Sequence, residues 1–220
     1  MKIAFSLATI LLFAMSVALA GSVTLPATMD TGLYRNAAED RDNFGHDHWI
    51  EIDDANEHGL VRWDLTSLPK GASVVKATIQ LDGFVPDKHA HIVQAYLVTH
   101  DWVEGTGKNI GTPPWSGLPR DGASWDTFSG FADHPNDAWT VAGGDFDKNI
   151  QGSATTIDGQ ETYYDDRALC LDATPIVKAW LADGRPNYGV LLKCANGSFK
   201  FKTREEGPAP RLVIEYDAPR

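Results

Sequence analysis

Side chains that could bind or transform a ligand are numerous in this chain of 220 residues. Seven of them are tryptophans, whose flat apolar faces can stack on the C–H patches of sugar rings. Tryptophan is also highly buried on average, so packing is the competing explanation for each one. The tryptophans therefore leave two alternatives open, a glycan-binding surface and a purely structural core.

Acidic side chains near turns are a second group of candidates. Asp145 and Asp147 follow two glycines in an expected loop. Calcium takes six to eight oxygen ligands, and the loops of a β-sandwich can bring carboxylates and carbonyls to one ion. We predict Asp145 and Asp147 as calcium ligands, and a solvated acidic surface is the alternative. Weaker candidates of the same kind are Asp40, Asp42, Asp53, Asp54, Asp165 and Asp166.

Two H-x-H pairs, His46 with His48 and His89 with His91, form a third group. Residues two apart on a strand face the same side, so each pair could offer two imidazoles to zinc or copper. Nothing in the sequence brings the pairs together, and histidines beside turns are common at protein surfaces. The sequence therefore leaves a transition-metal site and an ordinary surface role open.

No motif arranges these residues for catalysis. A glycosidase needs two carboxylates across a cleft, and a lyase needs a Tyr or His base near a group that neutralises a uronate. The chain has these residue types but no G-x-S-x-G, H-E-x-x-H or P-loop motif. We predict no catalytic residues, and a polysaccharide-degrading enzyme is a remote alternative.

The first 20 residues have the pattern of a secretory signal peptide. Lys2 precedes an apolar stretch, and Ala18-Leu19-Ala20 is the small-x-small pattern that signal peptidase accepts. The apolar stretch is shorter than the roughly 20 residues that span a bilayer, so we expect cleavage rather than membrane insertion. The prediction is a single secreted domain over 21–220, located outside the cell, in a periplasm or at the cell surface.

The formal net charge of −11 becomes −12 when Lys2 is removed. Such a surface repels nucleic acid and anionic membranes but attracts divalent cations. The two cysteines, Cys170 and Cys194, lie in two strands that we expect to be neighbours. Because exported proteins usually pair an even number of cysteines, we predict a Cys170–Cys194 disulfide, with two free buried thiols as the alternative.

Apolar and polar residues alternate in several segments with the period of half-buried strands. In 74–81 the residues expected to face inward are Val75, Ala77, Ile79 and Leu81. The other segments of this kind are 91–99, 198–203 and 211–216. Two sheets packed face to face would bury one face of every strand and leave the other wet. The prediction is an all-β, antiparallel, jelly-roll-like β-sandwich.

Two local features add to this fold. A short helix is expected after Thr174, which can cap it, with Pro175 in its first turn, an apolar stripe through Trp180 and an end at Gly184. Asn196-Gly197 suits a tight turn and predicts a hairpin between the strands on either side. The period is lost between Thr106 and Gln160, so long loops, and with them a binding surface, are expected there.

Short phrases along the chain also occur in a characteristic order. They are Gly59–Leu81, Asp101–Gly105, Gly122–Trp125, Gly143–Asp147, Asn187–Leu192, Thr203–Glu205 and Pro210–Tyr216. With these phrases, residues from about Ser22 to Tyr216 resemble DNRLRE-type domains. These are secreted β-sandwich modules related to the archaeal disaggregatase repeats and to an alginate-type family of carbohydrate-binding modules. The resemblance implies a non-catalytic extracellular module.

The resemblance also sorts the candidate residues. Five tryptophans lie in signature-like phrases and are expected in the core, whereas Trp49 and Trp115 lie outside the strongest phrases and remain candidates for stacking on sugar. The five are Trp63, Trp102, Trp125, Trp139 and Trp180. The sugar-binding members imply basic side chains for uronate carboxylates, and Arg62 is the leading candidate. Further basic candidates are Arg35, Arg41, Lys76 and Lys88.

The resulting prediction is a secreted module that binds an extracellular polysaccharide through Trp49, Trp115 and Arg62. A structural or adhesive component of the cell surface or matrix, able to self-associate, is the alternative, because the chain carries one such domain and no enzyme to target. The net charge opposes polyuronate binding unless calcium bridges protein and polymer.

Overall fold

A computed structural model describes residues 20–35, 42–85, 90–108, 119–130, 136–155, 162–163, 168–208 and 210–219. Within these residues the chain forms strands and one short helix. They are β1 Ala20–Tyr34, β2 Trp49–Ile52, β3 Glu57–Trp63, β4 Ser73–Leu81, β5 Gly83–Val85, β6 Ile92–Val98, β7 Phe146–Thr155, β8 Thr162–Tyr163, β9 Leu169–Asp172, α1 Thr174–Leu181, β10 Val190–Ala195, β11 Phe199–Lys202 and β12 Arg211–Asp217.

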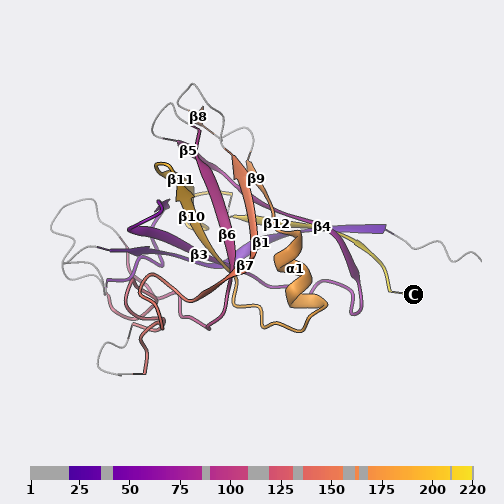
Figure 1. The fold of residues 1–220 in the computed structure, drawn as a ribbon, viewed down its shortest axis with the longest axis horizontal. Helices are drawn as coiled ribbons and strands as arrows, with labels where there is room; N and C mark the ends of the chain where they lie inside the picture. The colour runs from indigo at the N-terminus through magenta and orange to yellow at the C-terminus, as the bar shows by residue number, and fades with distance from the viewer. Residues whose placement is uncertain are drawn as a thin grey trace, which may run out of the picture.

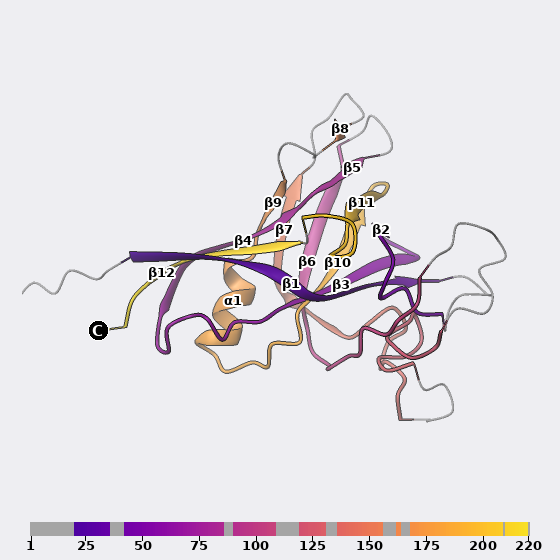
Figure 2. The same cartoon turned by 180° about the vertical axis from the view of Figure 1, so that it is seen from behind.

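The strands form a large and a small antiparallel sheet (Figures 1 and 2). The eight-stranded sheet has the order β7-β6-β10-β3-β1-β12-β4-β9, and the four-stranded sheet has the order β2-β11-β5-β8. The long strand β1 pairs with β12 through Ala20–Pro26 and with β3 through Ala27–Tyr34. The predicted all-β antiparallel sandwich with one short helix is confirmed.

The large sheet curls until its two end strands, β7 and β9, lie in contact. Gly152 of β7 makes this approach possible, because a Cβ atom there would lie 1.8 Å from the carbonyl oxygen of Asp172. Helix α1 packs against β4 and β7 (Figure 1). It buries Ile176, Val177 and Trp180 against the strands, as predicted. The two ends of the large sheet are thus covered by each other and by the helix.

The inner core fills the space between the two sheets and α1. It is mainly aliphatic, and strand residues with the expected two-residue period supply most of it. Phe199 and Phe201 of β11 are fully buried, and Leu212 and Ile214 of β12 belong to the same core cluster. The periods in 91–99, 198–203 and 211–216 therefore predicted the inner-facing residues of β6, β11 and β12.

A second cluster, the outer core, lies on the opposite face of the large sheet. Its buried members are Leu33, Leu60, Val98, Trp102, Ala123, Trp125, Trp139 and Leu191. Strands β3 and β10 are consequently buried on both faces, which explains the unbroken apolar run Val190-Leu191-Leu192. The prediction of a solvent-exposed outer face is therefore wrong for β3 and β10, because the connection between β6 and β7 covers that face.

Three local predictions need correction. Asn196 and Gly197 do adopt the positive φ angles of a tight turn, 67° and 135°, but β10 and β11 on either side belong to different sheets and form no hairpin. In β4 an extra residue opposite Glu215 and Tyr216 creates a bulge, so Val74 points inward and Val75 is 54% exposed.

The helix begins differently from the prediction. Asp172, rather than Thr174, accepts a hydrogen bond from the first turn, at 2.9 Å from the Thr174 backbone nitrogen. The hydroxyl of Thr174 instead accepts the N–H of Ala77 and ties the helix to β4. The positive φ of Gly184, 69°, agrees with the expected end of the helix.

Candidate functional site

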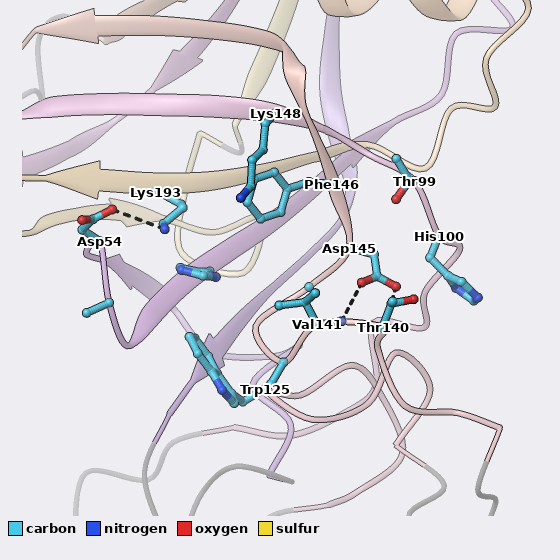
Figure 3. Close-up of a pocket in the computed structure, with 14 residues that line it drawn as sticks. Asp54, Thr99, His100, Trp125, Thr140, Val141, Asp145, Phe146, Lys148 and Lys193 are labelled. Atoms are coloured by element: carbon cyan, nitrogen blue, oxygen red, sulfur yellow. Dashed lines mark hydrogen bonds and ion pairs between the residues drawn. The ribbon is translucent and has the colours of Figure 1, made fainter.

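A cavity of about 590 Å³ opens on the outer face of the large sheet beside the outer core (Figure 3). We call it the His58 cavity. Three stretches of chain build it: the start of β3 with the turn before it, the end of β6, and the loop that leads into β7. It is lined by Asp54, Ala55, His58, Thr99, His100, Trp125, Thr140, Val141, Ala142, Gly144, Asp145, Phe146, Lys148 and Lys193.

The strand register brings His58 and Lys193 together. Because Leu192 pairs with Gly59 and Leu191 with Leu60, the next position places Lys193 opposite His58. Alternation along β3 and β10 directs both side chains to the outer face, where Leu60 and Leu191 enter the outer core. Two residues that are 135 positions apart in the sequence are thereby neighbours in the cavity.

His58 is only 6% exposed and is held in one tautomer. Its Nδ1 lies 2.7 Å from the carbonyl oxygen of Gly143, which can only accept, so Nδ1 carries the proton. Burial lowers the pKa of His58, and the positive charge of Lys193 acts in the same direction. The neutral ring therefore presents Nε2 as an acceptor, and this atom finds no hydrogen-bond partner among the described residues.

Charged groups of both signs surround the cavity. Lys193 lies 3.3 Å from a carboxylate oxygen of Asp54, which is itself largely exposed (Figure 3). Lys148 is exposed and has no ion pair within the part of the chain that the structure describes. Asp145 accepts the backbone N–H groups of Thr140 and Val141 at 2.9 and 3.0 Å, which fixes the loop before β7.

Aromatic rings form the apolar part of the wall. The ring of Trp125 lies 4.8 Å from that of His58, and Phe146 lies 4.8 Å from Tyr96. His100 stacks on Phe128 with ring centroids 4.0 Å apart. The cavity thus combines apolar faces with hydrogen-bond donors and acceptors.

The predicted sugar-binding residues do not meet at this cavity. Trp49 begins β2 in the small sheet, and the ammonium group of Lys202 lies 5.6 Å from its ring centroid. Arg62 lies near the other end of β3, where it bonds Asp101 at 2.8 Å. Trp115 lies outside the described residues, as do Arg41 and Lys88. The five tryptophans expected in the core are all buried, as predicted.

The predicted calcium ligands Asp145 and Asp147 are engaged with different partners. Asp147 accepts hydrogen bonds from Asn149 and lies 3.4 Å from the guanidinium of Arg185, whereas Asp145 holds the loop at Thr140. Among the described residues, no three His, Cys, Asp or Glu side chains are grouped as a metal ion would require.

The two H-x-H pairs also do not form a described metal centre. His46 is exposed and His48 contacts Glu206, while His91 is buried beside Gly197. His89 lies outside the described residues, together with Asp40, Asp165 and Asp166.

The predicted Cys170–Cys194 disulfide is not formed. Neither cysteine forms a disulfide, and Cys170 is exposed on β9 whereas Cys194 is buried on β10. The expectation that their strands are neighbours is wrong, because β9 pairs with β4 whereas β10 lies between β6 and β3.

Sequence reasoning missed His58, Thr140 and Lys148 as members of a site. The only signal near them was the phrase Gly143–Asp147, whose two glycines have positive φ and let the loop pass close to Trp125 and His58. The carbonyl of Gly143 and the ring of His58 meet only in the folded chain.

Comparison with models of known protein families gives no match, and a search of curated proteins gives none either. The resemblance to DNRLRE-type domains therefore stays a prediction from the quoted phrases. The described residues contain no helix with the length and apolar character needed to cross a membrane.

Proposed function

We propose that the protein is a secreted, non-catalytic β-sandwich module that binds an extracellular polysaccharide in the His58 cavity. One observation carries the proposal. The cavity places two lysines, Lys148 and Lys193, beside the aromatic side chains of Trp125 and Phe146. Sugar hydroxyls can accept from Lys148 and Lys193, and the face of a sugar ring can lie on an aromatic side chain.

The alternative of a structural or adhesive component would be favoured by free sheet edges, because such edges pair between copies of a chain. In the large sheet the end strands β7 and β9 contact each other instead. This closure leaves less room for assembly by strand pairing at the large sheet, whereas the small sheet ends in the strands β2 and β8.

Affinity electrophoresis through gels that contain single polysaccharides tests the proposal, with and without a calcium chelator. At least one polymer should retard the protein. Phe146→Leu removes a flat face but keeps apolar volume, and Lys148→Ala removes a donor, so each should weaken retardation by about tenfold or more. Lys178→Ala, an exposed lysine on α1, is the matched control and should behave as the wild type.

The outcomes separate the alternatives. Retardation that is lost in Trp115→Ala but kept in both cavity variants would move the binding site to the predicted loop tryptophan. Absence of retardation by every polymer, together with fibres in electron micrographs, would replace the proposal with the structural function.

A further inference from the structure

The charged residues that line the His58 cavity balance one another. Lys148 and Lys193 each carry a positive charge, Asp54 and Asp145 each carry a negative charge, and with its histidines neutral the described lining has no net charge. Lys193 forms an ion pair of 3.3 Å with Asp54 (Figure 3). The two lysines therefore do not give the cavity the surplus of positive charge that an anionic ligand needs.

Asp54 belongs to the turn between β2 and β3, but its neighbour Asp53 holds that turn. One carboxylate oxygen of Asp53 accepts the backbone N–H groups of the three residues after Asp54, at 2.8, 2.6 and 2.8 Å. The side chain of Asp54 contacts Lys193 instead and is 70% exposed, whereas that of Lys193 is only 18% exposed. Asp54 thus acts on the charge of the cavity rather than on the fold of the turn.

A neighbouring cavity of about 500 Å³ adjoins the same turn. It shares Asp54 and Ala55 with the His58 cavity, and its other charged lining residues are Glu51, Asp53 and Glu57. Within the described residues, no lysine or arginine lines it. A polymer that continues from the His58 cavity past Asp54 therefore meets carboxylates, and a polyuronate would bring one negative charge per sugar toward them.

We propose that Asp54 makes the His58 cavity selective for neutral polysaccharides over uronate polymers. By pairing with Lys193, Asp54 leaves that ammonium group able to donate to hydroxyls but cancels the charge that would hold a carboxylate. The inference rests on the function proposed for the cavity, and it adds the class of ligand and the residue that determines this class. It differs from the uronate binding that the resemblance to an alginate-type family implies.

Binding to matched pairs of immobilised polymers tests the inference. The probes are glucomannan, galactomannan and mixed-linkage β-glucan. Each is compared with a derivative whose primary hydroxyl groups are oxidised to carboxylates, so that the backbone and its linkages stay the same. Biolayer interferometry with the full chain gives the dissociation constants. The wild type should bind at least one neutral polymer about tenfold or more tightly than the oxidised form of that polymer.

Asp54→Asn is the decisive variant. It removes the negative charge but keeps an oxygen that accepts from Lys193, so the affinity for the neutral polymer should stay within about twofold. The affinity for the oxidised polymer should rise by about fivefold or more, because the charge of Lys193 is no longer compensated. This gain should shrink in about 1 M salt, where charges farther apart than roughly 3 Å are screened. It should be lost when Lys193→Met is added.

Asp183→Asn is the matched control, because Asp183 is exposed after α1 and lines neither cavity. It removes the same charge from the chain and should leave the preference of the wild type unchanged. The inference is overturned, while polysaccharide binding stands, by an equal gain in both variants, by no gain in Asp54→Asn, or by a wild type that prefers an oxidised polymer. Absence of binding to every polymer in either form contradicts the proposed function, and the inference with it.

Discussion

The two faces of the large sheet are buried in different ways. The inner core consists mainly of aliphatic side chains that strands and α1 supply at regular spacing. The outer core combines Trp102, Trp125 and Trp139 of the connection between β6 and β7 with apolar side chains of the large sheet, over the central strands β3 and β10. The backbone N–H and C=O groups of regular strands form hydrogen bonds within the sheet. A buried irregular segment must instead form its backbone hydrogen bonds with side chains or other loops.

The outer core shows how an irregular layer can be buried at all. The indole N–H of Trp102 donates to the carbonyl of Tyr188 at 2.7 Å, and that of Trp139 donates to the carbonyl of Ser124 at 2.9 Å. Tryptophan thus supplies both apolar area and a donor that binds loop backbone. Asn43 has a related role, because its side-chain amide bonds the carbonyls of Glu104 and Ala123.

Asp30 of β1, Glu104 of the connection between β6 and β7, and Arg204 after β11 form a group that we call the charged junction. Arg204 makes a paired contact with Glu104, at 2.9 and 2.7 Å, and Glu104 also accepts the backbone N–H of Asp30. The carboxyl of Asp30 is fully buried and accepts the N–H of Arg204. Residues of the quoted phrases Asp101–Gly105 and Thr203–Glu205 therefore have a structural role in this protein.

The largest expected effect comes from truncating one aromatic residue in each core. Phe201→Ala and Trp102→Ala should each lower the free energy of unfolding by about 3 to 5 kcal/mol, because each leaves a cavity among buried neighbours. Urea unfolding followed by circular dichroism measures both. A single shared transition is expected if the outer core is part of the domain. A separate early transition in Trp102→Ala alone would show that the loop layer unfolds independently.

The charged junction should have the next largest effect. Glu104→Ala is expected to cost about 2 to 3 kcal/mol, because it leaves the Arg204 guanidinium and the Asp30 N–H without their shared acceptor. Urea unfolding of both single variants and of the double variant with Arg204→Ala gives the coupling energy. If the effects of the two single variants add up in the double variant, Glu104 and Arg204 are not energetically coupled and the prediction is contradicted.

Asp30 predicts a pH dependence of stability. Burial raises its pKa from the ordinary 3.8 to about 8, and the nearby Glu205 and Glu104 act in the same direction, against the hydrogen bond from Arg204. At pH values between 3.8 and about 8, the Asp30 carboxyl keeps its proton in the folded state and releases it in the unfolded state. Stability from this group is therefore full below pH 3.8 and falls as pH rises toward 8, by at most about 1.4 kcal/mol per pH unit.

Thermal unfolding of Asp30→Asn between pH 4 and 8 checks this prediction. The variant has no carboxyl to titrate at position 30. Its melting temperature relative to that of the wild type should therefore rise as pH increases. A constant difference over this range would contradict a raised pKa.

The smallest effect is expected at the exposed cysteine. Cys170→Ser should change stability by less than about 0.5 kcal/mol, because the side chain is exposed and forms no disulfide. Titration of the folded protein with a thiol reagent should find one reactive group, Cys170, and a second only after unfolding exposes Cys194. Absence of any free thiol in the folded, purified protein would restore the predicted disulfide.

Local patterns in the sequence predicted the parts of the molecule that depend on near neighbours. Alternation identified β4, β6, β11 and β12, and Pro175 with the apolar stripe identified α1. The same reasoning missed β7 because its sequence is mostly polar and small. That strand is defined by pairing with β6 and by the approach of Gly152 to β9.

The candidate sites were less predictable than the strands. The phrase Gly143–Asp147 pointed to the right loop, but the contact of His58 with Gly143, 85 residues away, forms only in the folded chain. Arg62 was chosen from the sequence, yet the lysines and arginines that line the His58 cavity are Lys148 and Lys193. The spacing of these residues along the chain does not predict such contacts.

By itself, the sequence determined an all-β chain of alternating strands with one short helix, because side-chain period and turn residues act over a few positions. Only the tertiary structure decided that the loop tryptophans cover a second face of the sheet, that Cys170 and Cys194 stay apart, and that the His58 cavity forms at the start of β3. These features depend on sheet order and on contacts between distant segments, which the curling of the large sheet and its bulges determine.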